Sequence, residues 1–363
     1  MSGSSPEASD ARTLSVMRVV RCDPPAPNRP APALPDERLV AECADLARKH
    51  PEARLRRLAV VRAPDLDKVA GATVWLGLES LQVTGSFKVR GALVAVADAI
   101  ERRGSGAEVV AASACNHGAG VAWAAALLGA RATICVPAAT PEAKRAPIRA
   151  SGAELVALDA GGYDEAEDTA RALSRERGAE WISPYDDVRV IAGNGASLGH
   201  ELCDALKRPP ATVLTPFGGG GLACGLALAL RARGARTAVW GAQSEASPAM
   251  ARSLERGAAE TRLPVAPTLA DALEGGIAED AFERARRLVA GVVVVPEERI
   301  ASAMAFLYKE LGLVVEGGGA TSLAAIDALP DDARGGDLVV LLTGRNVDRA
   351  RLDEAVRGAA RAW

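Results

Sequence analysis

The chain has 363 residues, of which 49% are hydrophobic and 25% are charged, so it is long enough to bury one large core or two smaller ones. Its formal net charge is −3, and no basic block stands out, which argues against a nucleic-acid partner. No uninterrupted apolar run approaches the roughly 20 residues that span a membrane. We therefore expect a soluble protein with neither nucleic acid nor membrane as a partner.

Cysteine and histidine usage argues against a disulfide scaffold and a metal site. The six cysteines contain no CxxC pair, and the N-terminus lacks a charged region followed by an apolar core, so we expect a reducing cytoplasm. The three histidines, His50, His117 and His200, are widely separated and are not grouped with cysteines at ligand spacing. We expect no zinc site.

The N-terminal segment differs in composition from the rest of the chain. Residues 1–36 are rich in Pro, Ser, Ala and Arg and end in DPPAPNRPAPALPDE, which predicts a disordered arm. Three roles remain open for this segment: it could be a mobile tail, an arm that packs around a second subunit, or a lid over a pocket. From Glu37, the stretch ERLVAECADLARKH has the periodicity of an amphipathic helix.

From Thr73 onward, strand-like and helix-like stretches alternate almost to the end of the chain. The expected strands are apolar throughout: TVWLGL, EVVAAS, ATICVP, AELVAL, TVLTPF, TAVWGAQ, VVVVP and DLVVLLT. Helical stretches of roughly 10 to 18 residues separate them, mostly closed by glycine. Buried strands alternating with helices predict an α/β fold with mostly parallel sheet covered on both faces. Ligands then bind in the loops at the carboxyl ends of the strands.

The stretch GSFKVRGA places Lys88 near a loop-to-helix junction, between Phe87, Val89 and small residues. A solvated surface position is the ordinary expectation for lysine. A lysine in a packed segment, however, tends to have a lowered pKa, which suits it to a Schiff base with an aldehyde cofactor. Such a cofactor also needs a phosphate-binding loop and partners for its ring.

Four consecutive glycines, Gly218 to Gly221, lie between an expected strand and an expected helix. Converging backbone N–H groups and the helix N-terminus suit a phosphate, although a flexible turn would have the same composition. Gly218, Gly220 and Ala223 also satisfy GxGxxA, the dinucleotide fingerprint of nicotinamide oxidoreductases. That alternative leaves Lys88 unexplained.

Two further loops carry polar groups after expected strands. In SACNHGAG, Ser113 could cap the following helix, and Asn116 offers both a donor and an acceptor. His117 in the same loop could serve a ligand or be a structural histidine. Thr343 could cap the turn after its strand or offer a hydroxyl to a ring nitrogen.

These motifs together resemble a known family. In order and spacing, GSFKVRGA, SACNHGAGVA, PYDDVRVIAGNGA, FGGGGL, VVEGGGA and TGRN are similar to the pyridoxal-phosphate enzymes of fold type II, in the serine/threonine dehydratase and serine racemase branch. The resemblance covers about residues 69 to 350. It implies two lobes of open, twisted, mostly parallel sheet, as in the tryptophan synthase β-like fold, and a homodimer. The implied domains are a large cofactor-binding domain, 37–107 plus 188–363, and a small mobile substrate-closing domain, 108–187.

The resemblance also assigns roles to individual residues. Lys88 should hold the cofactor as a Schiff base, with Phe87 beside the ring and the Gly218 to Gly221 loop on the phosphate. Asn116 should face the ring's 3-oxygen, Thr343 should meet the pyridine nitrogen, and Glu316 should approach the ring from the far side. The predicted cofactor-binding residues are therefore Phe87, Lys88, Asn116, Gly218, Gly219, Gly220, Gly221, Leu222, Glu316 and Thr343. Those predicted to receive the substrate are Ser113, Ala114, Cys115, Asn116 and His117.

The activity implied by the resemblance is that of an ammonia-lyase, which eliminates the β-substituent of an amino acid to give a 2-oxo acid and ammonia. β-Replacement in a specialised pathway uses the same catalytic residues and remains open. A non-enzymatic homologue is disfavoured because Lys88 and the glycine loop are both present.

Several positions depart from the family pattern. Ala114 stands where serine racemase has its second acid/base, so we expect elimination with little racemisation. Cys115 and Ala272 both stand where the family usually has glycine, and Ala272 lies near the expected substrate pocket. These substitutions favour a substrate other than ordinary serine or threonine. Gln243, Ser247 and Ala249 replace the acidic ligands of the divalent-metal site found in some relatives, so that site should be absent.

Overall fold

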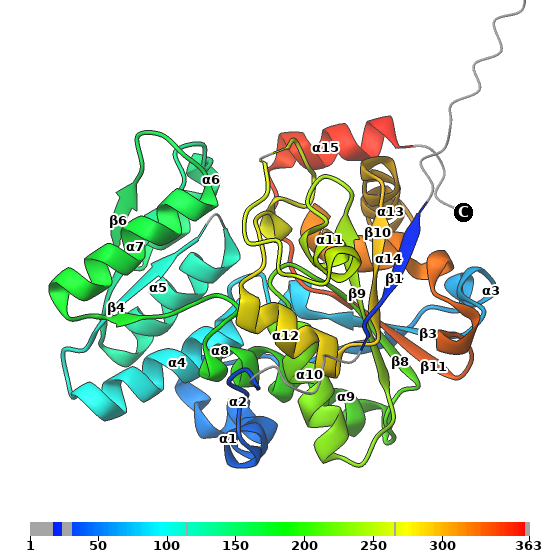
Figure 1. Cartoon of the computed structure of the whole chain (residues 1–363), viewed down its shortest axis with the longest axis horizontal. Helices are drawn as coiled ribbons and strands as arrows, with labels where there is room; N and C mark the ends of the chain where they lie inside the picture. Colours follow the sequence, from blue (N-terminus) through cyan, green and yellow to red (C-terminus); the bar gives the residue numbers. More distant parts are fainter. Residues whose placement is uncertain (1–16, 24–30, 114, 265, 360–363) are drawn as a thin grey trace, which may run out of the picture.

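The computed structural model describes residues 17–23, 31–113, 115–264 and 266–359. Its strands form a seven-stranded sheet in the order β1-β10-β9-β8-β11-β3-β2 and a four-stranded sheet in the order β6-β5-β4-β7 (Figure 1). The strands are β1 (Arg18–Arg21), β2 (Val60–Arg62), β3 (Thr73–Leu78), β4 (Glu108–Ala112), β5 (Arg131–Val136), β6 (Glu154–Ala157), β7 (Glu180–Trp181), β8 (Thr212–Pro216), β9 (Ala238–Ser244), β10 (Gly291–Val295) and β11 (Asp337–Leu342).

Helices cover both sheets. They are α1 (Glu37–Glu42), α2 (Leu46–Lys49), α3 (Asp67–Ala70), α4 (Lys88–Arg103), α5 (Asn116–Leu128), α6 (Glu142–Ala150), α7 (Tyr163–Arg177), α8 (Val188–Ile191), α9 (Ser197–Leu206), α10 (Gly221–Ala232), α11 (Ala249–Arg256), α12 (Glu279–Leu288), α13 (Glu297–Lys309), α14 (Gly317–Ala324) and α15 (Arg349–Gly358). Short 3₁₀ turns link several of them, and a π-helical turn, Ala192–Ala196, lies between α8 and α9. Among the described residues, no helix is both long and apolar enough to cross a membrane.

The expected α/β architecture with mostly parallel sheet is confirmed. The inner strands of the large sheet, β10, β9, β8, β11 and β3, pair in parallel. Every residue of β8, β10 and β11 is buried because helices pack on both faces of the sheet. In β11, for example, Val340 joins the core with α13 to α15, whereas Val339 joins the core with α9 to α12. The mainly apolar residues of these strands, on both faces, fit a sheet that is covered on both sides.

The small sheet has the same two-sided construction. In β4, Val109 and Ala111 pack into one core with residues of α4, α5 and α6, whereas Val110 and Ala112 pack into another with α7. Its four strands lie within the predicted range 108–187. Figure 1 shows this lobe beside the large one, with α4 leading into it and α8 leading out.

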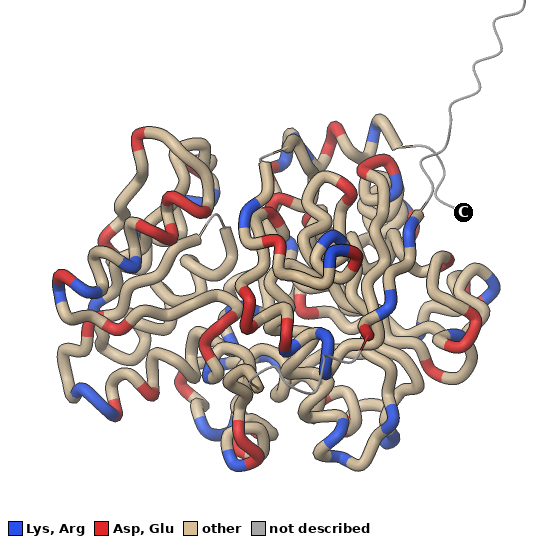
Figure 2. The backbone as a smooth tube through the Cα atoms, in the orientation of Figure 1, with Lys and Arg blue, Asp and Glu red and all other residues tan. Residues whose placement is uncertain are grey.

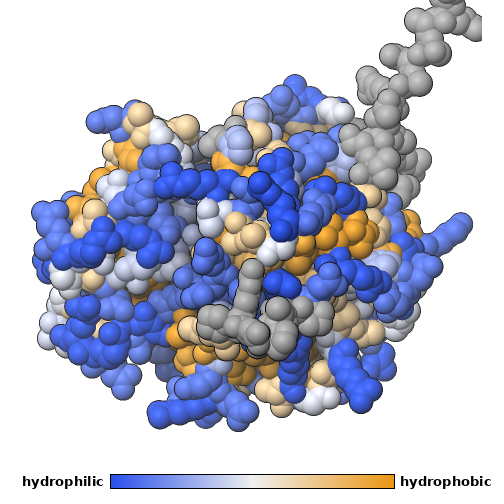
Figure 3. Space-filling view, viewed as in Figure 1, coloured by the Kyte–Doolittle hydropathy of each residue, from blue (hydrophilic) through white to orange (hydrophobic). Residues whose placement is uncertain are grey.

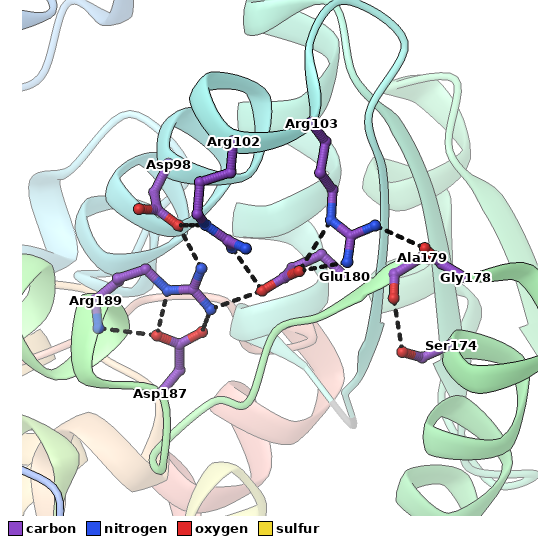
Figure 4. Close-up of polar contacts among 9 residues, drawn as sticks. All are labelled: Asp98, Arg102, Arg103, Ser174, Gly178, Ala179, Glu180, Asp187 and Arg189. Atoms are coloured by element: carbon purple, nitrogen blue, oxygen red, sulfur yellow. Dashed lines mark hydrogen bonds and ion pairs between the residues drawn. The ribbon is translucent and has the colours of Figure 1, made fainter.

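An ion network holds the point where the chain leaves the small lobe (Figure 4). Arg189 of α8 contacts Asp98 of α4, Asp187 at 2.8 Å and Glu180 of β7 at 3.1 Å. Glu180 also accepts hydrogen bonds from Arg102 at 2.7 Å and from Arg103. Because these groups come from α4, β7 and α8, the network ties the small sheet to both connections with the large lobe.

The prediction of a disordered arm is wrong for part of residues 1–36. Arg18–Arg21 form β1, the antiparallel edge strand beside β10, because their backbone groups pair with the free edge of that strand. Arg21 also lies over the Trp240 ring, 5.5 Å from its centroid, and pairs with Asp332 at 2.6 Å. Residues 1–16 and 24–30 lie outside the described part of the chain.

Other local predictions need smaller corrections. The helix expected from Glu37 is present but is broken into α1 and α2 by a 3₁₀ turn, Cys43–Asp45. The short strands β2 and β7 were not expected. Charges of both signs are interspersed over the two lobes (Figure 2). On the face shown in Figure 3, hydrophilic side chains predominate, and apolar ones form patches between them.

Candidate active site

Lys88 is the first residue of α4, and its side chain faces a cavity between the lobes. Its ammonium group, Nζ, donates a hydrogen bond to the carbonyl oxygen of Pro184 at 3.0 Å and lies 5.3 Å from the centre of the Phe87 ring. Removal from water lowers the pKa of Lys88 to about 8, because burial disfavours its charged form. About a tenth of this amine is therefore neutral and nucleophilic at pH 7, far more than for an ordinary lysine.

A buried ion network fixes the start of α4. Arg90, two residues after Lys88, is fully buried and donates hydrogen bonds of 2.9 Å to both carboxylate oxygens of Glu79 and of Glu201. The two carboxylates keep the Arg90 pKa above its usual value despite burial. The next residue, Gly91, donates a hydrogen bond from its N–H to Asn194 Oδ1 at 2.8 Å. Lys88 therefore projects from a rigid helix start, and its sequence neighbour Arg90 is structural.

The glycine loop lies between β8 and α10, with Gly221 as the first residue of the helix. Gly220 has φ +79°, a left-handed conformation that favours glycine. A Cβ at Gly219 would overlap the ring of Tyr185, which packs directly on the loop. Backbone N–H groups thus converge at the N-terminus of a 12-residue helix, which is a phosphate-binding arrangement.

The loop after β4 reaches the same cavity. Asn116 begins α5, and its Nδ2 donates to Glu316 Oε1 at 2.6 Å, while its Oδ1 accepts from Asn346 Nδ2 at 2.7 Å. The suggestion that Ser113 caps α5 is wrong, since Cys115 occupies the cap position and Ser113 Oγ instead accepts a hydrogen bond from the Cys115 N–H at 3.0 Å. Ala114 lies outside the described residues.

His117 and Glu316 have pKa values shifted chiefly by burial. His117 Nε2 lies 3.0 Å from the carbonyl oxygen of Ile182, and burial, assisted by the charge of Lys88, lowers the His117 pKa to about 3. The imidazole is therefore neutral and Nε2 donates the proton in that contact. Burial raises the Glu316 pKa to about 7, although the Asn116 hydrogen bond opposes that shift. Glu316 is thus partly protonated near neutral pH.

Thr343 follows β11 and is only 5% exposed. Its carbonyl oxygen accepts a hydrogen bond of 3.1 Å from the N–H of Phe87, which links this strand end to the lysine segment. The structure brings Thr343, Lys88 and every other described residue of the predicted site to the lining of one cavity: Phe87, Ser113, Cys115, Asn116, His117, Gly218, Gly219, Gly220, Gly221, Leu222 and Glu316.

Sequence reasoning missed other parts of the lining. Two tyrosines line the cavity: Tyr163 at the start of α7 and Tyr185 in the segment between β7 and α8. Two acidic residues also line it, Asp271 and Glu274, from the segment between α11 and α12. Tyr185 lies within the motif PYDDVRVIAGNGA, but the motif alone does not indicate that its aromatic ring packs against the glycine loop. The acidic pair has no local sequence signal.

The cavity fits a cofactor that carries an aldehyde, a phosphate and a pyridine ring. A lysine of lowered pKa suits the aldehyde, the amide cradle of Gly218 to Gly221 suits the phosphate, and the hydroxyl of Thr343 lines the same cavity. The family profile described as "Pyridoxal-phosphate dependent enzyme" matches residues 54–344. The chain belongs to this family.

Several known proteins are similar to this chain over most of its length. An L-threonine ammonia-lyase of Thermotoga maritima is 38% identical over 307 residues, covering 83% of this chain and 74% of the relative. A putative threonine dehydratase of Sinorhizobium fredii is 35% identical over 327 residues, covering 89% and 97%. The structure of maize serine racemase matches with a TM-score of 0.80 at 27% identity, covering 90% of this chain and 98% of that one.

Pyridoxal 5'-phosphate is therefore the cofactor, and the fold is that of the fold type II enzymes in the serine/threonine dehydratase-like branch. The GxGxxA pattern in the glycine loop is therefore part of a pyridoxal-phosphate site and does not indicate a nicotinamide cofactor. The protein is an enzyme.

Proposed function

We propose that the protein is a pyridoxal-phosphate-dependent ammonia-lyase. It removes the β-substituent of a β-hydroxy or otherwise β-substituted amino acid and yields a 2-oxo acid and ammonia. The observation that carries the proposal is the position of Lys88, whose pKa is about 8, in one cavity with the Ser113 to His117 loop and the glycine loop. Relatives named as threonine ammonia-lyases support the same reaction class.

Lys88 would move the proton in this reaction. When bound, the cofactor delocalises the charge left on the α-carbon of the amino acid. Lys88 Nζ would hold the cofactor, and the same amine would act as the base that accepts the α-proton of the amino acid. The carbonyl of Pro184, 3.0 Å from Nζ, orients the amine. The neutral hydroxyl of Thr343, unlike a carboxylate, would not force protonation of the pyridine nitrogen, which favours prompt elimination.

The loop from Ser113 to His117 would bind the substrate carboxylate. The N-terminus of the 13-residue helix α5 begins at Asn116 and favours an anion. Neutral His117, fixed by the carbonyl of Ile182, packs beside this position. Glu316, held by Asn116, would lie on the far side of the ring. Phe87 and Leu222 would pack against the cofactor.

The absence of a second base at position 114 supports elimination over racemisation. Ala114 has no group that exchanges a proton, so Lys88 would serve the α-carbon from one face. Comparable rates of racemisation and elimination by one purified preparation would contradict this proposal.

Other features belong to the same proposal. We infer a cytoplasmic homodimer without nucleic-acid or membrane partners, and a small domain, 108–187, that moves to close over the substrate. The interspersed surface charges and the net charge of −3 support the absence of nucleic acid. Analytical ultracentrifugation of the holoenzyme tests the dimer.

One assay separates elimination from β-replacement. The holoenzyme is incubated with single β-substituted amino acids, and 2-oxo acid and ammonia are measured. Their release from the amino acid alone supports the lyase. Product that forms only when a second, nucleophilic substrate is added would replace this proposal with β-replacement.

A further inference from the structure

Arg284 of α12 is a buried arginine to which the proposed reaction assigns no role. It is only 1% exposed, although arginine normally lies at the surface. Its Nη1 donates a hydrogen bond to the carbonyl oxygen of Ala33 at 3.0 Å, and its Nη2 forms an ion pair with the carboxylate of Asp186. A buried charge destabilises a fold unless it is paired, so these two contacts decide where the guanidinium lies.

Asp186 directly follows two residues, Pro184 and Tyr185, that line the cavity faced by Lys88, the catalytic cavity. The carbonyl oxygen of Pro184 accepts the hydrogen bond from Lys88 Nζ at 3.0 Å. The ring of Tyr185 packs on Gly219 of the glycine loop. Because only Tyr185 separates Asp186 from Pro184 and the peptide groups between them are planar, a shift of Asp186 would move both the carbonyl and the ring.

The segment around Asp186 also makes local contacts. The Asp186 N–H donates a hydrogen bond to Ser183 Oγ at 3.1 Å. The Asp187 carboxylate caps α8 by accepting a hydrogen bond from the Arg189 N–H at 2.8 Å. The contact from Arg284 is of a different kind, because α12 packs on α10, the helix that begins in the glycine loop. Arg284 therefore ties this segment to the helix pair that carries the expected phosphate site.

The other partner of Arg284 belongs to the N-terminal segment. Ala33 lies in the sequence Pro32-Ala33-Leu34-Pro35, in which both prolines are buried although Ala33 is exposed. The ring of proline restricts the backbone, so two buried prolines hold the Ala33 carbonyl in a fixed direction. The two ends of the guanidinium are thus fixed by segments that lie about 150 residues apart in the sequence, since Ala33 holds Nη1 and Asp186 holds Nη2.

We propose that Arg284 is a positioning residue for Lys88. Through Asp186 it fixes the Pro184 carbonyl against the lysine amine, and residues 31–36 keep the guanidinium in place. The same contact steadies the aromatic ring that packs on the glycine loop. The N-terminal segment is then part of the support of the catalytic cavity, which needs its reacting groups held to a fraction of their own size. This inference rests on the proposed function, in which Lys88 holds the cofactor and accepts the α-proton.

Cofactor binding and turnover together test this role. The full-length, cofactor-free protein is titrated with pyridoxal phosphate, and kcat and KM are measured for the holoenzyme at saturating cofactor. Arg284→Met should raise the dissociation constant of the cofactor and lower kcat, each by about tenfold or more, because a displaced amine loses its alignment. KM for the amino acid should change less than about threefold. Arg284→Lys keeps the charge and should recover part of both losses.

A second pair of variants separates positioning from stability. Asp186→Asn leaves the Arg284 charge buried without its ion pair, so urea unfolding should show a loss of stability. The double variant Arg284→Met/Asp186→Asn removes both charges and should recover much of that stability. Its cofactor affinity and kcat should nevertheless stay as low as in Arg284→Met. If affinity and kcat recover together with stability, Arg284 supports the fold alone and the proposal is wrong.

Arg286→Met is the matched control. Arg286 lies on the same helix and also bonds the N-terminal segment, with Nε 3.3 Å from the carbonyl oxygen of Asp23. Its loss should leave cofactor affinity within about twofold, and an effect equal to that of Arg284→Met would overturn the proposal.

The N-terminal segment is tested by the double variant Pro32→Gly/Pro35→Gly. Cofactor affinity should fall by roughly threefold or more, because the Ala33 carbonyl is no longer held in one direction. Unchanged affinity would overturn the role of residues 31–36. If the wild-type holoenzyme forms no 2-oxo acid from any β-substituted amino acid, the proposed lyase activity fails, and the cofactor titration still decides the role of Arg284.

Discussion

Lys144 of the small lobe forms an ion pair with Asp271 of the large lobe, with Nζ 2.6 Å from Oδ2. The Lys144 side chain is only 9% exposed, and Arg351 of α15 shares the same carboxylate oxygen. Because Asp271 lines both the catalytic cavity and an adjoining cavity of about 850 Å³, this pair joins the lobes beside the catalytic cavity.

Replacing Lys144 should weaken lobe closure. Lys144→Met keeps most of the apolar stem and removes the charge, so we expect KM for the amino acid to rise about fivefold, with a smaller change in kcat. Arg262→Met is the matched control, since Arg262 contacts Asp168 across the same lobes at 3.5 Å, but both side chains are about 70% exposed. Steady-state kinetics that show equal effects of the two variants would contradict a special role for Lys144.

Loss of Arg90 should strongly destabilise the fold. Arg90→Met leaves the buried carboxylates of Glu79 and Glu201 without their cation, so we expect the free energy of unfolding to fall by about 3–5 kcal/mol. Arg38→Met removes an exposed pair with Glu42 and should leave the free energy of unfolding almost unchanged. Urea unfolding measures the free energy of unfolding of both variants. The loss for Arg90→Lys should lie between the losses for Arg90→Met and Arg38→Met. A loss below about 1 kcal/mol for Arg90→Met would refute the structural role.

Glu316 should make stability depend on pH. Its folded-state pKa, about 7, lies above the ordinary value of 4.5, so the folded protein binds this proton more tightly than the unfolded chain. The contribution of Glu316 to the free energy of unfolding is therefore fully present below about pH 4.5. This contribution declines as the pH rises toward 7. In Glu316→Gln this decline should be absent, so the free energy of unfolding should fall by roughly 3 kcal/mol less between pH 4.5 and pH 7 than in the wild-type protein. Urea unfolding from pH 4.5 to 8 gives the comparison, and parallel pH profiles would exclude a raised pKa.

The glycine loop should tolerate no side chain at position 219. A Cβ there would overlap the Tyr185 ring, so Gly219→Ala should displace either the ring or the loop. We expect the affinity for the cofactor to fall at least about tenfold, which corresponds to a loss of about 1.4 kcal/mol of binding free energy. Gly358→Ala, where a Cβ meets open space, is the control. Titration of the cofactor-free protein with pyridoxal phosphate measures affinity. Equal affinities of the two variants would show that the loop does not hold the phosphate.

Much of the fold could be predicted from the sequence because fully apolar strands alternate with helices closed by glycine. The prediction failed where pairing is non-local. Arg18–Arg21 have no strong strand pattern and are ordered by the free edge of β10. The helix from Glu37 kept its apolar face, but its break into α1 and α2 depends on packing that the local pattern does not encode.

The site divides in the same way. Lys88, Asn116, Thr343 and the Gly218 to Gly221 loop follow strands at the binding edge of the sheets, so loop position and residue type indicated them. Asp271 and Glu274 come from a segment between helices and reach the cavity through tertiary structure alone. Tyr185 is similar, since its packing on Gly219 joins two segments far apart in the sequence.

In the proposed reaction, Lys88 holds the cofactor and moves the α-proton in an elimination. The most direct measurement compares the wild-type protein with Lys88→Ala, following the absorbance of the bound cofactor together with 2-oxo acid formation from a β-substituted amino acid. We predict a yellow wild-type protein that borohydride bleaches and that forms 2-oxo acid and ammonia without a second substrate, and a variant that binds cofactor but shows neither property. If Lys88→Ala retains the absorbance band or turnover, Lys88 does not hold the cofactor and move the α-proton.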